Sequence, residues 1–221
     1  QIFDILADRK KKTIVEYLKK FPNLDEVKYF VMDMNHVYLG ICKELFPNAK
    51  PVADRFHYTR CCTEAGEAVR KRVQDSLSSK ARKRFKKSRK LLLKKEGKLS
   101  PEERVAVEAL LAHSEDLTRA WLLKEDFYRF LQSKDSDEAK RKLDQFCYSA
   151  KKLQLPEFEP LLKTLKNWEP YILNSFDCPY SNGFTEGTNN SIKVLKRVTY
   201  GMPNFRNFRA RILHCCSKVV P

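Results

Sequence analysis

The sequence contains no apolar run of the roughly 18 residues that a membrane-spanning helix needs, and its first residues show no signal-peptide pattern. It also lacks internal repeats and low-complexity tracts. Its seven cysteines are an odd number and include two adjacent pairs, but no C-x-x-C motif. We therefore expect reduced thiols rather than a disulfide framework or a zinc site.

Negative charge is scarce as well. The chain has 28 Asp and Glu against 44 Lys and Arg, which gives a net charge of +16. A surplus of this size on a folded chain favours a polyanionic partner, with nucleic acid ahead of a membrane surface. The 221 residues are enough to bury a core and predict one domain, or one domain with an insertion.

The amino-terminal part predicts an α/β arrangement. The run "VKYFVMD" is rich in β-branched and aromatic residues and ends on Asp33, as a buried strand would. The helical segment "HVYLGICKELF" follows, with Asn35 placed to cap it, and "KPVADRFH" then supplies a second strand that ends near Asp54. Strand, helix and strand within about thirty residues predict a parallel pair. The stretch "IFDILA", residues 2–7, alternates weakly and is a further candidate strand.

From Tyr58 to Phe176 the pattern is helical only, and we expect four or five helices there. Ser100 and Glu103 form a capping box in "SPEE", with Pro101 at the first helical position. The densest charge lies in "KARKRFKKSRKLLLKKEGK", residues 80–98, which holds eleven Lys and Arg against one Glu. Phe85 and the following leucines favour a helix for this block. Its cations either form a solvated face or neutralise phosphate.

A single glutamate in a basic helix raises the question of chemistry. On a helical wheel of "NGFTEGTNNSIKVLKRV", one stripe holds Glu186, Asn190, Lys193 and Arg197. The apolar residues fall opposite and are expected to pack: Phe184, Ile192, Leu195 and Val198. Asn182 and Gly183 allow a tight turn and a cap at its start. The stripe by itself also fits an ordinary solvated face.

Asp33 adds a second carboxylate at a strand end, where open α/β sheets place their sites. Hard divalent ions such as Mg²⁺ bind one or two carboxylates together with substrate phosphates. A strand-end Asp, a later helical Glu and a strongly basic surface together indicate metal-dependent nucleic-acid chemistry.

The two regions "VMDM…Y…FPNAKPVADRFH" and "SNGFTEGTNNSIKVLKRVTYGMPNFRNFRARIL" resemble the catalytic region of bacterial insertion-sequence transposases of the ISL3 group. The resemblance covers nearly the whole chain. It implies an RNase H-like fold with an aspartate–aspartate–glutamate metal set. We therefore expect an incomplete RNase H-like mixed sheet interrupted by a large helical insertion, mostly helical overall. The expected parts are residues 1–58 as the first part of the core, 59–178 as the insertion and 179–221 as the closing helices.

Residue by residue, the resemblance makes Asp33 the second metal-binding aspartate and Glu186 the metal-binding glutamate. Asp54 and His57 match a D-x-x-H element near the active site, and Asn190 lies on the face of the glutamate. The cations expected to contact DNA lie in the two closing helices and in the basic block: Lys193, Arg197, Arg206, Arg209, Arg211, Arg82, Lys83, Arg84, Lys86 and Lys87.

One departure from the family pattern is important. The first aspartate of the family lies on a strand upstream of the segment that "IFDILADR" resembles, so we expect this chain to begin near the third strand and to lack that ligand. Asp4 and Asp8 match positions after the catalytic strand and are not taken as substitutes. The amino-terminal DNA-binding modules of such proteins are also expected to be missing, so the chain is interpreted as a truncated or partial protein.

The resemblance implies DNA strand cleavage and strand transfer of an insertion sequence, with two Mg²⁺ or Mn²⁺ ions in the complete site. Water and then a 3′-hydroxyl would attack phosphodiesters in line. Without the first aspartate, we expect this chain alone to be defective. The alternative is a non-enzymatic, basic nucleic-acid-binding remnant. The expected partner is double-stranded DNA, both transposon ends and target, with no membrane and with a homodimer allowed, in the cytoplasm of a bacterium at its nucleoid.

Overall fold

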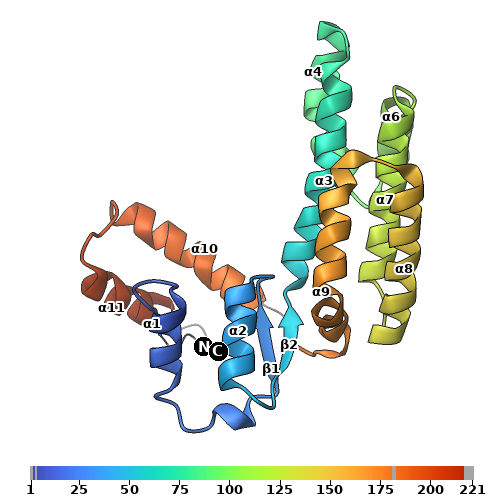
Figure 1. Cartoon of the computed structure of the whole chain (residues 1–221). Coiled ribbons are helices and arrows are strands. Elements are labelled where there is room, and N and C mark those ends of the chain that lie inside the picture. Colours follow the sequence, from blue (N-terminus) through green and yellow to red (C-terminus); the bar gives the residue numbers. More distant parts are fainter. Residues whose placement is uncertain (1, 3, 181–182, 217–221) are drawn as a thin grey trace. The chain divides into compact units, whose positions relative to one another are not determined.

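The computed structural model describes residues 2, 4–180 and 183–216, without the side chains of four residues of the basic block (80, 84, 86 and 87). The chain divides into two compact units. The first contains residues 1–51 and 180–221, and the second contains residues 52–179. Figure 1 shows that helices dominate both units.

The first unit begins with helix α1 and contains the small sheet. Its elements are α1 (Lys11–Leu18), the short 3-10 helix η1 (Leu24–Glu26), β1 (Tyr29–Met32), α2 (His36–Leu45), α10 (Gly183–Val198) and α11 (Phe205–Cys216). Val15, Ile41 and Phe46 form its buried cluster, and half-buried side chains such as Phe30 pack against them. Through this cluster α1 packs against α2, and α2 packs against β1.

Strand β2 (Lys50–Ala53) lies where the chain passes from the first unit to the second. It pairs with β1 in a two-stranded parallel sheet, with α2 as the crossover, as the sequence predicts. Asn35 caps α2 by accepting a hydrogen bond from the backbone N–H of Val37 at 2.8 Å. The predicted strand at residues 2–7 is absent from the described part of that segment, where Asp4 instead binds the side chain of Arg209.

The second unit is helical. Its elements are α3 (Arg55–Asp75), α4 (Ser79–Lys87), α5 (Arg89–Leu93), η2 (Glu96–Lys98), α6 (Pro101–Leu111), α7 (Glu115–Leu131), α8 (Ser136–Leu153), η3 (Pro156–Phe158) and α9 (Glu159–Asp177). Seven α-helices replace the four or five expected, and the basic block contributes two of them, α4 and α5. The predicted capping box at the start of α6 is present.

A four-helix bundle of α3, α7, α8 and α9 forms the centre of this unit, since each of these helices packs against two of the others in a closed ring (Figure 1). Its core is aromatic. Phe127 is fully buried, with its ring centroid 5.4 Å from that of Phe130 and 5.1 Å from that of Phe146. Tyr58 of α3 is also buried, and its hydroxyl lies 2.9 Å from Oγ of Ser175 in α9. Among the described residues, no helix is both long and apolar enough to cross a membrane.

Candidate functional site

Asp33 follows the last residue of β1, at the carboxyl end of the strand. It is half-buried, and its backbone carbonyl accepts a hydrogen bond from the N–H of Asn35 at 2.6 Å. Because Asn35 also caps α2, the chain turns immediately after Asp33. Strand, turn and capped helix together define the position of this carboxylate.

Asp54 and His57 lie together in the first turn of α3. Asp54 is the N-cap and accepts a hydrogen bond from the N–H of Phe56 at 3.3 Å. Its other carboxylate oxygen lies 3.7 Å from Nε2 of His57, and the side chain of Asp54 is only 11% exposed. The D-x-x-H element is therefore a helix-capping turn that brings a carboxylate and an imidazole together.

The donor types of these residues suit a metal ion. Asp33, Asp54 and His57 each offer one atom that can bind a metal, two carboxylate oxygens and one imidazole nitrogen. Oxygen donors are the ligands that Mg²⁺ and Mn²⁺ prefer, whereas imidazole also suits transition metals.

Glu186 lies in the first turn of α10, in the same unit as Asp33. The side chain is exposed, and the described part of the chain contains no ion pair of this carboxylate. A helix N-terminus carries partial positive charge from its unsatisfied N–H groups, so this position stabilises an anionic carboxylate. The predicted cap Asn182 lies outside the described residues.

The polar stripe of α10 is exposed along its whole length, from Glu186 through Asn190 and Lys193 to Arg197. Within it, Nζ of Lys193 lies 3.5 Å from Oδ1 of Asn190, at the limit of a hydrogen bond. Both lysine and arginine are thus on the solvent side of the helix that carries Glu186.

The expected packing of the opposite, apolar side is wrong. Phe184 is 51% exposed and Val198 is 66% exposed, while Ile192 and Leu195 are only half-buried. No residue of α10 is buried. Within its own unit α10 packs against α11, which covers too little of this side to bury it.

The remaining predicted DNA contacts differ in their surroundings. Arg206 and Arg211 are exposed on α11, as expected, but Arg209 donates from Nε to a carboxylate oxygen of Asp4 at 2.6 Å. Arg82 pairs with Asp75 at 2.7 Å, and Lys83 is exposed. The side chains of Arg84, Lys86 and Lys87 lie outside the described part of the structure.

Sequence reasoning missed two buried cations, Arg70 of α3 and Lys124 of α7. A signal for Lys124 was available, because it follows Leu117 and Ala120 at helical spacing and precedes Phe127. A lysine on the apolar stripe of a helix is a buried charge that needs partners. Nothing in the local pattern distinguishes Arg70 from the exposed cations around it. All seven cysteines are free.

Comparison with known proteins gives a consistent family match. A family described as transposase, of the DDE type and the ISL3 group, matches residues 1–212. The transposase for insertion sequence element IS1001 of Bordetella parapertussis is 24% identical over 220 residues, which cover 96% of this chain and 53% of that protein. The transposase for insertion sequence element IS1557 of Mycobacterium tuberculosis is 27% identical over 195 residues, which cover 78% of this chain and 43% of that protein.

A Lactococcus lactis subsp. lactis protein named ATP-dependent protease is 35% identical over 108 residues, or 48% of this chain and 33% of that protein. That match covers less than half of the chain, whereas the family match covers residues 1–212. The chain spans between 33% and 53% of the length of these relatives. No solved structure matches the chain.

Proposed function

The chain belongs to the DDE transposase family of the ISL3 group, and we propose that it supplies carboxylates and DNA contacts with which such a protein cuts and rejoins insertion-sequence DNA. The observation that supports this most directly is the pair of carboxylates in one unit. Asp33 lies at the end of a strand, and Glu186 lies in the first turn of a helix without an ion-pair partner among the described residues.

Asp33 and Glu186 would hold the divalent ion, because carboxylate oxygens are the donors that Mg²⁺ and Mn²⁺ bind. When bound, such ions neutralise charge on the scissile phosphate and lower the pKa of the attacking hydroxyl or water. We propose two ions for the complete site, and an RNase H-like sheet as the scaffold of the complete protein.

The side chains of the protein itself would position the reacting groups. The turn after β1 holds Asp33, and Asp54 holds the imidazole of His57 beside the start of α3. Lys193 and Arg197 extend from the face that carries Glu186 and would bind the phosphate backbone next to the reacting group. Fixed charges of this kind lower the barrier by orientation and electrostatic stabilisation.

The proposed substrate is double-stranded DNA, as transposon ends and as target, at the nucleoid of a bacterium. A homodimer would bring two transposon ends together. Since the chain spans about half of the two transposase relatives, these properties are proposed for the complete protein.

The decisive test is calorimetric titration of the chain with Mn²⁺, compared with the variant Asp33→Asn/Glu186→Gln. Both substitutions keep the size of the side chain and remove its charge. We expect the double variant to bind Mn²⁺ at least about tenfold more weakly, because two charged ligands are lost. Glu26→Gln is the matched control, since Glu26 is an exposed carboxylate of the same unit.

Equal binding by the wild-type chain and the double variant, or no binding by either, would overturn the assignment of these two carboxylates as a metal set. If such a chain still bound DNA, the non-enzymatic nucleic-acid-binding alternative would replace the proposal. Metal binding lost in the double variant and kept in the control supports the transposase site.

A further inference from the structure

The second unit concentrates its unbalanced charge in one place. From Ser79 to Lys98, which we name the basic segment, the chain contains eleven Lys and Arg but one Glu. From Glu115 to Leu153, over α7 and α8, nine Lys and Arg face eight Asp and Glu. Many cations of the bundle are also paired, as in the contact of Lys140 with Asp144 at 2.6 Å. The surplus charge of this unit therefore lies on α4, α5 and η2.

The basic segment is anchored to the bundle despite its self-repulsion. Phe85 of α4 is 1% exposed, and Ser88 and Leu92 are also buried. Helix α4 packs against α3 and α5, and the ring of Phe85 lies 5.5 Å from that of His113, which follows α6. Figure 1 shows α4 extending past the ends of α8 and α9. Apolar burial of Phe85 and Leu92 favours this position, since burying each such side chain contributes about 1.5–3 kcal/mol.

Arg70 of α3 binds the carboxyl end of α4. Its Nη1 donates to the carbonyl oxygen of Phe85 at 3.0 Å, and its Nε and Nη2 donate to the two oxygens of Glu67, both at 2.7 Å. Arg70 is buried, with 6% of the residue exposed. A positive charge at a helix C-terminus satisfies carbonyl groups that have no intrahelical partner and is favourable with the helix dipole.

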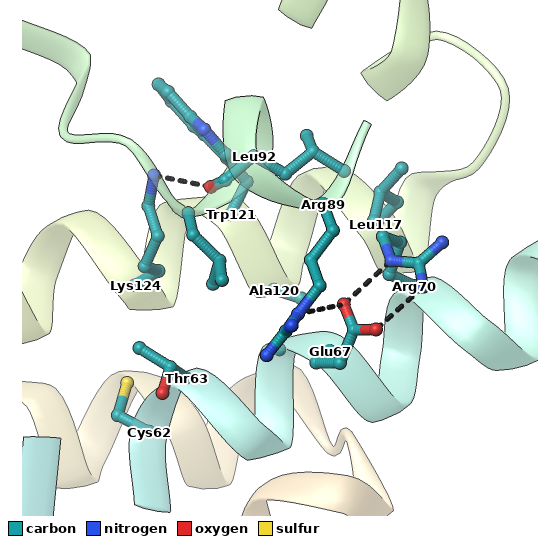
Figure 2. A pocket seen from close by; sticks show the side chains of 12 residues that line it. Cys62, Thr63, Glu67, Arg70, Arg89, Leu92, Leu117, Ala120, Trp121 and Lys124 are labelled. Atoms are coloured by element: carbon teal, nitrogen blue, oxygen red, sulfur yellow. Dashed lines mark hydrogen bonds and ion pairs between the residues drawn. The ribbon is translucent and has the colours of Figure 1, made fainter. Parts of the chain in front are cut away.

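Lys124 of α7 binds the carboxyl end of α5. Its Nζ donates to the carbonyl oxygens of Leu92 at 2.9 Å and of Lys94 at 2.7 Å, and it pairs with Glu125 at 2.6 Å. Glu125 in turn accepts a hydrogen bond from the N–H of Glu96 at 3.0 Å. Figure 2 shows Arg70 and Lys124 on opposite sides of one small pocket, with Leu92 above it.

These anchors leave lysines on the outside of the basic segment. Lys83, Lys90 and Lys98 are exposed, and no acidic partner of theirs is found among the residues that the structure describes. Arg82 and Arg89 are partly neutralised by Asp75 and Glu67. Lysines without an acidic partner are available to neutralise phosphates and release their counterions.

We propose that the basic segment is a second phosphate-binding surface of the protein, which binds the backbone of double-stranded DNA through Lys83, Lys90 and Lys98 without reading the bases. The choice of DNA rests on the proposed function. The surface lies in the second unit, whereas Glu186 and the stripe of α10 lie in the first. It therefore adds a contact to the DNA beyond that of the catalytic carboxylates.

The test is fluorescence anisotropy with a labelled 30-base-pair duplex of arbitrary sequence, titrated at several KCl concentrations. For the variant Lys83→Gln/Lys90→Gln we expect about tenfold weaker binding near 0.1 M salt. The slope of log affinity against log salt should become shallower by about 2, since each lost phosphate contact removes about 0.9. With a duplex of scrambled sequence, the variant should show the same decrease in affinity and in slope.

Two controls belong to this experiment. Lys151→Gln/Lys152→Gln removes the same charge from exposed positions at the end of α8 and is expected to change the slope by less than 0.5, about half of one phosphate contact. Lys83→Arg/Lys90→Arg keeps the charge and is expected to restore the affinity. Because all these side chains are exposed, far-ultraviolet circular dichroism should be unchanged.

Equal losses in the Lys83/Lys90 and Lys151/Lys152 variants would overturn the proposal, as would an unchanged slope. Binding of the segment to phosphatidylserine vesicles but not to the duplex would also overturn it. The Mn²⁺ titration is independent of this result. If metal binding fails while the salt slope responds to Lys83 and Lys90, the catalytic assignment is wrong and the phosphate-binding surface stands.

Discussion

Asp4 and Arg209 are 205 residues apart in sequence, and Nε of Arg209 donates a hydrogen bond to Asp4 at 2.6 Å. The contact joins the beginning of the chain to α11 within the first unit. It assigns a structural role to an aspartate that the sequence suggests only as an unlikely metal ligand. It also uses an arginine that the sequence assigns to DNA.

We predict that Asp4 titrates far below an ordinary aspartate. The hydrogen bond from Arg209 is the main cause that lowers its pKa from 3.8 to about 2, with a further hydrogen bond from the N–H of Ile5. Since the folded-state pKa is lowered, the contribution of the contact to stability is complete above about pH 4 and is lost as the pH falls toward 2.

The measurement is an NMR titration of the Asp4 side-chain carboxyl carbon. In the variant Arg209→Gln its pKa should rise toward 3.8, whereas Arg211→Gln, on the exposed side of α11, should leave it near 2. A pKa of about 2 that persists in Arg209→Gln would show that Arg209 is not the cause.

A second prediction concerns the loss of folding stability at high pH. Burial raises the pKa of Tyr58 to about 12, although its hydrogen bond with Ser175 lowers it somewhat. The folded state therefore keeps the phenol proton that the unfolded chain loses near pH 10, and stability decreases as the pH rises from 10 to 12. Tyr58→Phe removes this linkage.

We expect Tyr58→Phe to cost about 1 kcal/mol at pH 8, where the hydrogen bond to Ser175 is lost. Between pH 9 and 11 the variant should lose less stability than the wild-type protein in urea titrations. Parallel losses in both proteins would contradict the assignment of the raised pKa to Tyr58.

The third prediction concerns the aromatic centre of the bundle. Phe127 is completely buried among Phe130, Phe146 and Tyr58, so Phe127→Ala removes a large side chain from a packed core. We expect a loss of about 3–5 kcal/mol in the free energy of unfolding. Leu122→Ala on the same helix, at a position 46% exposed, should cost less than about 1 kcal/mol. Urea denaturation measures both, and similar losses would mean that the bundle core is not centred on Phe127.

Local signals in the sequence predicted much of the fold. The β-branched and aromatic run before Asp33 formed β1, Asn35 capped α2, and Ser100 with Glu103 formed the capping box. These features depend on residues a few positions apart, so a short stretch of chain contains all the atoms that they need. Among the described residues of 2–7 the predicted strand did not form, because a strand also needs a neighbour to pair with, which its own residues do not supply.

The sequence predicted which residues belong to the candidate site, but not how they are arranged in space. Asp33 and Glu186 were found from the end of a strand and from a stripe on a wheel. Helical periodicity correctly predicted the exposure of that stripe. It failed for Phe184 and Val198, because a wheel shows which residues share a side and cannot show whether another element covers them.

The sequence by itself determined the charge surplus, the helical and strand segments, the caps and the identity of the candidate carboxylates, since all of these follow from composition and short spacing. Only the tertiary structure decided that Arg209 binds Asp4 and that Arg70 and Lys124 bind the ends of α4 and α5. Each of these contacts joins groups whose distance is set by the path of the folded backbone. A buried charge is stable only where that path brings carbonyl oxygens and carboxylates to it.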